Sequence, residues 1–111
     1  MDEKQIFDYA LNPEKLISSQ DCNRVIAFLN GRITDLEETE YEQQLVADAK
    51  LNHLVNENSA AKALIMWKIT DEYKKLKLTQ KSLRQMRRYR DTLRGRFDVL
   101  MRTKQFIREN I

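Results

Sequence analysis

The feature that most restricts the fold of this chain is a repeat of apolar residues in its second half. From Ile65, alternating steps of four and three residues lead to Ile107, and nine of the thirteen positions on this path are apolar. A strict seven-residue repeat drifts around a straight helix, so its residues stay buried only when the helix supercoils against a partner. The repeat therefore predicts one long helix over residues 59–108 that pairs in coiled-coil fashion.

The apolar positions of this path form a seam through which the long helix would pair. Charges at two seam positions, Glu72 and Arg90, are costly unless they are paired, and in coiled coils such residues often fix register or oligomeric state. We interpret both as determinants of pairing specificity. The seam residues that we expect to contact a partner helix or a second copy are Leu83, Met86, Leu93, Phe97, Leu100 and Ile107.

The scarcity of turn residues gives the fold class. Two glycines and one proline in 111 residues are too few for the turns that a β-sheet needs. We predict an all-α fold, a long antiparallel helical hairpin or coiled coil with one or two short N-terminal helices, in a single domain. A helix of about 50 residues would extend roughly 75 Å. A compact chain of this length has a radius of gyration of only about 13 Å.

The N-terminal half predicts two kinds of helix. Residues 1–20 hold two short capping helices, which the Asn12-Pro13 pair separates. Residues 21–56 form an acidic helix, capped by Asp21, that could break near residue 31 or over 40–44. At residue 31 we favour a continuous helix, because the apolar phase runs through Gly31 and a glycine in a helix costs only about 1 kcal/mol. Over residues 40–44, one helix with a polar middle and two separate helices are both possible.

The turn of the hairpin is expected in the polar stretch of residues 56–59. With the turn near residue 57 or 58, the numbers of facing residues sum to about 115. The apolar end of the long helix, from Leu93 to Ile107, then extends past its partner. The short N-terminal helices or a second copy could cover it, and we expect a homo-oligomer.

Charge is divided unevenly along the chain. Residues 1–59 hold 12 acidic and 5 basic side chains, whereas residues 60–111 hold 15 basic and 5 acidic ones. Such a division indicates either that the two halves face each other or that the basic half meets a polyanion.

Basic side chains on the long helix predict a nucleic-acid contact. Several of them fall on one stripe opposite the seam, where a row of cations can follow a phosphate backbone. Tyr89 could stack on an exposed base. The predicted nucleic-acid contacts are Lys77, Lys81, Arg84, Arg87, Arg88, Arg94 and Arg96.

Neutralisation within the fold is the alternative for part of this charge. The hairpin register places the acidic stretch of residues 37–42 opposite residues 73–78, which include Lys74, Lys75 and Lys77. The arginines from Arg84 onward instead face residues 19–31, which are almost free of acids. We therefore expect these uncompensated arginines to be stronger candidates for nucleic-acid contact than the lysines.

No residue pattern predicts catalysis, a metal site or a cofactor. His53 stands without a cysteine or a second histidine near it, and Gly31 and Gly95 do not form a phosphate-binding loop. Trp67 and Tyr73 lie among apolar residues and are typical of core packing.

The cellular setting is predicted by what the sequence lacks. No run of eighteen apolar residues could span a membrane, and the first residues do not resemble a signal peptide. The single cysteine, Cys22, falls on an apolar helical face, so we interpret it as a small core residue. We expect a cytoplasmic protein.

These patterns favour a non-enzymatic accessory protein that binds DNA or RNA non-specifically through the basic face of its C-terminal helix. The alternative is an adaptor, scaffold or inhibitor that binds another protein through the coiled-coil seam. Contact with a membrane surface ranks third, since the seam suits helix pairing. The general character of the chain is similar to that of many phage-encoded accessory proteins, including recombination mediators, and this likeness assigns no functional residue.

Overall fold

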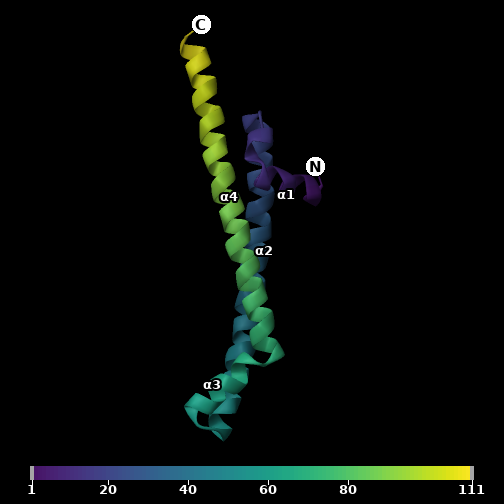
Figure 1. The fold of residues 1–111 in the computed structure, drawn as a ribbon, viewed down its shortest axis with the longest axis vertical. Coiled ribbons are helices and arrows are strands. Elements are labelled where there is room, and N and C mark those ends of the chain that lie inside the picture. The colour runs from purple at the N-terminus through teal and green to yellow at the C-terminus, as the bar shows by residue number, and fades with distance from the viewer. Residues whose placement is uncertain (1, 111) are drawn as a thin grey trace. The chain divides into compact units, whose positions relative to one another are not determined.

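The computed structural model describes residues 2–110 (Figure 1). Every element of this range is helical, so the all-α prediction is confirmed. The elements are α1 (Glu3–Leu11), the 3₁₀ helix η1 (Pro13–Lys15), α2 (Ser19–Glu57), α3 (Ala60–Lys68) and α4 (Asp71–Glu109).

The chain divides into two compact units. The terminal unit comprises Met1–Ile33 and Gln85–Ile111, and the central unit comprises Thr34–Arg84. Each long helix contributes one segment to each unit, and the units are described separately below.

The two long helices run without interruption through the places where the sequence allowed a break. Gly31 lies inside α2 and Gly95 inside α4, and neither adopts a positive φ angle. Residues 40–44 are helical as well. The preference for a continuous helix at Gly31 is therefore confirmed, and of the two alternatives at residues 40–44 the structure has the unbroken helix.

The prediction of one helix over residues 59–108 is wrong at residues 69–70. The Thr70 hydroxyl accepts a hydrogen bond from the Tyr73 N–H at 3.3 Å and lies 2.6 Å from the Trp67 carbonyl oxygen, to which it donates. A threonine that caps a new helix in this way ends the old one. Ile65 and Ile69, which the heptad path places on the seam, are consequently 69% and 70% exposed.

Helix α1 begins with a side-chain cap, whereas η1 does not. Asp2 and Gln5 form a capping box, with hydrogen bonds of 2.8 and 3.0 Å, at the start of α1. Pro13 occupies the first position of η1. The side chain of Asn12 makes no cap to η1 and instead donates to the carbonyl oxygen of Asp8 at 3.2 Å.

The predicted cap of α2 is wrong, whereas the predicted turn before α3 is confirmed. Asp21 was expected to cap α2, but the Ser18 hydroxyl accepts from the Asp21 N–H at 3.4 Å and the helix begins at Ser19. The predicted turn is confirmed, since α2 ends at Glu57 and Ser59 caps α3.

The terminal unit is built around α2 and α4, with α1 packed beside them. The thiol of Cys22 donates to the carbonyl oxygen of Leu93 at 3.3 Å, and the two numbers sum to the predicted 115. Burial raises the pKa of the Cys22 thiol, and the charge of Arg96 opposes this effect. The buried apolar residues of this unit are Ile6, Ala10, Leu16, Cys22, Val25, Ile26, Leu29, Ile33, Met86 and Leu93.

The central unit is built from the second part of α2, α3 and the first part of α4. The indole N–H of Trp67 donates to the carbonyl oxygen of Ala47 at 2.9 Å, which attaches α3 to α2. The rings of Trp67 and Tyr73 meet edge to face with centroids 4.8 Å apart. The buried side chains of this unit are Ala47, Leu54, Ala63, Leu76, Thr79 and Leu83.

Candidate nucleic-acid interface

Four cations of the central unit surround a shallow depression on α4, which we call the basic hollow. Its volume is about 520 Å³. Steps of three and four residues bring the side chains to one side of the helix. The residues that line it are Tyr73, Lys74, Lys77, Leu78, Lys81 and Arg84.

Two non-basic side chains accompany these cations. The Tyr73 ring is half-buried, and the Lys77 ammonium lies 5.3 Å from its centroid, a cation–π distance. Leu78 is 66% exposed. The basic hollow therefore offers apolar surface as well as positive charge.

The cations of the basic hollow have no acidic partner. Within the described residues, no carboxylate forms an ion pair with Lys74, Lys77, Lys81 or Arg84. All four side chains are exposed. The basic hollow thus keeps its full positive charge.

Among the described residues, the predicted neutralisation by the acidic stretch does not take the form of ion pairs with the lysines of α4. Lys75 comes nearest, because it shares a groove of about 420 Å³ with Glu42 and Glu72. Gln43 and Val46 complete that groove, and the Gln43 side-chain oxygen is buried without a hydrogen-bond partner.

In the terminal unit, one of the predicted nucleic-acid contacts, Arg94, lies beside an acid that the seam residue Arg90 shares. Arg94 lies 3.9 Å from the Asp91 carboxylate, and Arg90 lies 3.3 Å from the same oxygen atom. Arg87 and Arg88 are exposed on α4. The charge of this group is thus partly offset.

Arg96 has a structural contact that its sequence position did not indicate. Its Nε–H donates to the Leu16 carbonyl oxygen at 2.9 Å, and Nη2 donates to that of Glu14 at 3.4 Å. The side chain is half-buried. It holds the chain between η1 and α2 against α4, which leaves fewer donors for a phosphate.

Tyr89, predicted as a stacking residue, packs inside the terminal unit. Its ring lies 6.2 Å from that of Phe7, and its hydroxyl accepts from the Gln85 amide at 2.7 Å. The ring therefore helps to fix α1 to α4.

The predicted seam residues divide into three groups. Leu83, Met86 and Leu93 are buried within their own units. Phe97 and Leu100 are half-buried, and Ile107 is 53% exposed. A groove of about 370 Å³ follows this last stretch, lined by Ile17, Ser18, Ser19, Gln20, Leu100, Thr103, Lys104 and Ile107.

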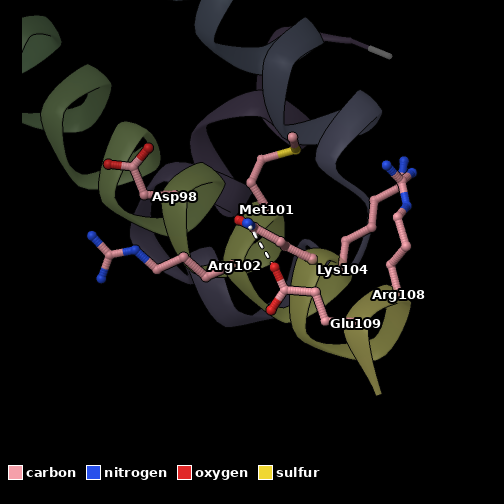
Figure 2. A pocket seen from close by; sticks show the side chains of 7 residues that line it. Asp98, Met101, Arg102, Lys104, Arg108 and Glu109 are labelled. Atoms are coloured by element: carbon pink, nitrogen blue, oxygen red, sulfur yellow. Dashed lines mark hydrogen bonds between the residues drawn. The ribbon is translucent and has the colours of Figure 1, made fainter. Parts of the chain in front are cut away.

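A second charged depression lies at the end of α4, with a volume of about 580 Å³ (Figure 2). All of its lining residues belong to that helix, and they include acids beside the cations. Gln105 donates to Glu109 at 3.2 Å. The lining residues are Asp98, Met101, Arg102, Lys104, Gln105, Arg108 and Glu109.

Neither a candidate metal site nor a candidate membrane span occurs within residues 2–110. No group of three or more histidine, cysteine or acidic side chains there is arranged to hold a metal ion. His53 is exposed and lies 3.4 Å from Glu57. None of the helices described has the length and apolar character to cross a bilayer.

Comparison of the chain with protein-family models, curated proteins and solved structures gives no match.

Proposed function

We propose that this protein is a non-enzymatic accessory protein that binds DNA or RNA through phosphate groups, with little sequence preference. The observation that supports this proposal is the basic hollow, in which four exposed cations surround one depression and form no ion pair within residues 2–110. Lysine and arginine side chains of this kind supply the sequence-independent part of nucleic-acid affinity.

Phosphate contact in the basic hollow follows from the spacing of its cations. Lys74 and Arg84 are ten residues apart on α4, about 15 Å along a helix axis. A backbone segment lying along this stretch meets a cation at every helical turn. Contacts to phosphates carry no sequence information, so base identity contributes little to this binding.

Salt provides the first test of this proposal. Up to four phosphate contacts predict a slope of about −3 to −4 in a plot of log affinity against log salt concentration. Between about 50 and 200 mM salt, the affinity for labelled single-stranded and double-stranded oligonucleotides should fall roughly 100-fold.

A charge-matched control makes the test specific to the basic hollow. The variant Lys77→Ala/Lys81→Ala/Arg84→Ala should lose most of the binding. The control variant Lys50→Ala/Lys62→Ala/Lys68→Ala removes the same charge from other parts of the central unit and should bind nearly as well as the wild type. Equal losses in both variants would show that only net charge matters.

Binding to another protein is the second candidate function. It is supported by the groove beside Leu100 and Ile107, which could receive an apolar helix. This function predicts binding that tolerates salt and that is lost in Leu100→Asp, while the variant without the three cations of the basic hollow still binds.

A further inference from the structure

The solvent side of α2 in the central unit carries apolar residues among acids. Tyr41 is 67% exposed and Leu45 is 55% exposed, and Glu38 and Glu42 lie exposed on the same side of the helix. We call these four residues the acidic face. Neither Glu38 nor Glu42 forms an ion pair within the described residues.

The basic hollow combines the same elements with the opposite charge. Leu78 is 66% exposed, and lysines stand around it on α4. Isolated apolar residues on a surface are ordinary. Here the apolar residues of the acidic face lie beside carboxylates, and Leu78 of the basic hollow lies beside lysines. The two surfaces are therefore complementary in charge.

An antiparallel arrangement of the two helices matches these groups in detail. Facing residues in such a pair have a constant sum, so placing Tyr41 against Leu78 fixes the remaining partners. Glu42 then faces Lys77. Glu38 faces Lys81, and no like charges meet among these positions.

The contact has to join two molecules. In α2 the buried residues Ala47 and Leu54 lie opposite the acidic face, and in α4 the buried Leu76 and Leu83 lie away from the basic hollow. The two surfaces of one central unit therefore point away from each other. A contact between unlike surfaces of two copies is heterologous and produces rings or open chains.

We propose that the acidic face of one copy docks on the basic hollow of a second copy and excludes nucleic acid from it. The carboxylates take the places that phosphates would occupy, and Tyr41 covers Leu78. The exclusion rests on the proposed function, whereas the self-association does not. Nucleic acid then dissociates the assembly, because it competes with the acidic face of the second copy for the same lysines.

Charge exchange tests the self-association without nucleic acid, by sedimentation velocity at low salt. The variant Glu38→Lys/Glu42→Lys and the variant Lys77→Glu/Lys81→Glu should each associate at least about tenfold more weakly than the wild type. An equimolar mixture of the two should associate again, because each variant then presents a surface complementary to the other. The control Glu14→Lys/Glu109→Lys should associate like the wild type.

The outcomes separate the two proposals. A wild type that stays monomeric at about 100 μM, or a mixture of variants that stays monomeric, overturns the self-association and leaves nucleic-acid binding untouched. Association restored in the mixture, without oligonucleotide binding by any variant, supports the self-association and defeats the proposed function. If both proposals hold, an oligonucleotide dissociates the wild-type assembly, and Glu38→Lys/Glu42→Lys binds that oligonucleotide more tightly than the wild type does.

Discussion

Two groups of cations on α4 differ in what surrounds them. Lys77, Lys81 and Arg84 of the central unit line one depression and have no acidic partner in the part of the chain that the structure describes. Arg94 and Arg96 of the terminal unit lie beside Asp91 or donate to backbone carbonyl oxygens. A basic residue on a helix is thus a candidate for binding only when the fold has not already used its hydrogen-bond donors.

The largest expected effect contrasts binding with stability in the central unit. Lys77→Ala/Lys81→Ala/Arg84→Ala should weaken oligonucleotide binding by about 100-fold at low salt, which corresponds to about 2.7 kcal/mol. The free energy of unfolding should change by no more than about 1 kcal/mol, because the three side chains are exposed and the cation–π contact of Lys77 with Tyr73 contributes only about 0.5–1 kcal/mol. Fluorescence anisotropy and urea denaturation measure the two quantities. If this variant bound oligonucleotides as well as the wild type, the cations of the basic hollow would be no better candidates for binding than Arg94 and Arg96.

Arg96 should show the opposite behaviour. Arg96→Ala leaves the carbonyl oxygens of Leu16 and Glu14 without their donor and should lower the free energy of unfolding by about 1–3 kcal/mol. Oligonucleotide affinity should change less than about threefold. The control is Arg94→Ala, because the ion pair of Arg94 with Asp91 is exposed and contributes at most about 1 kcal/mol. A large loss of binding with unchanged stability would place Arg96 in the interface after all.

Substitution of the two helical glycines, Gly31 and Gly95, should change stability without changing binding. A Cβ atom added at Gly31 or Gly95 meets no atom within 4 Å, and both residues lie inside helices. Gly31→Ala and Gly95→Ala should each raise the free energy of unfolding by up to about 1 kcal/mol. Neither should alter binding in the central unit. Thermal denaturation followed by circular dichroism measures the gain, and a loss in either variant would indicate that its helix needs the flexibility of glycine.

The smallest effect concerns Cys22 and alkaline pH. Burial raises the pKa of the folded thiol, so the unfolded chain releases this proton at a lower pH than the folded chain does. Its contribution to stability is complete below the ordinary thiol pKa of about 8.5 and declines as the pH rises above that value. Urea denaturation of the wild type and Cys22→Ala, between about pH 7 and 10, should show a steeper decline for the wild type. If the stability of both proteins declined equally with pH, the buried thiol of Cys22 would not have a raised pKa.

Much of the fold could be predicted because it depends on local patterns. The polar stretch at residues 56–59 located the turn, and the position of the turn gave the register that joins Cys22 to Leu93. The break at Thr70 was missed because a heptad count spans many turns and overlooks a single capping threonine. The sequence Thr70-Asp71-Glu72, with two acids in the first turn, carried that signal.

The candidate site was less predictable, because it depends on contacts between distant residues. The carbonyl oxygens that Arg96 binds are at least 80 positions away in the chain, and no periodicity announces them. The pairing of Tyr89 with Phe7 is equally remote. The predicted hairpin register placed acids opposite the lysines and so favoured the arginines as the binding residues. Within residues 2–110, however, it is Lys74, Lys77, Lys81 and Arg84 that share one depression and form no ion pair.

The salt dependence of oligonucleotide binding, measured for the wild type and for Lys77→Ala/Lys81→Ala/Arg84→Ala, tests the central claim most directly. We predict a slope of about −3 to −4 for the wild type and a slope shallower by about 2 to 3 for the variant. Equal slopes for the two proteins, or a wild type that binds no oligonucleotide at about 50 mM salt, would contradict the assignment of the basic hollow as a nucleic-acid interface.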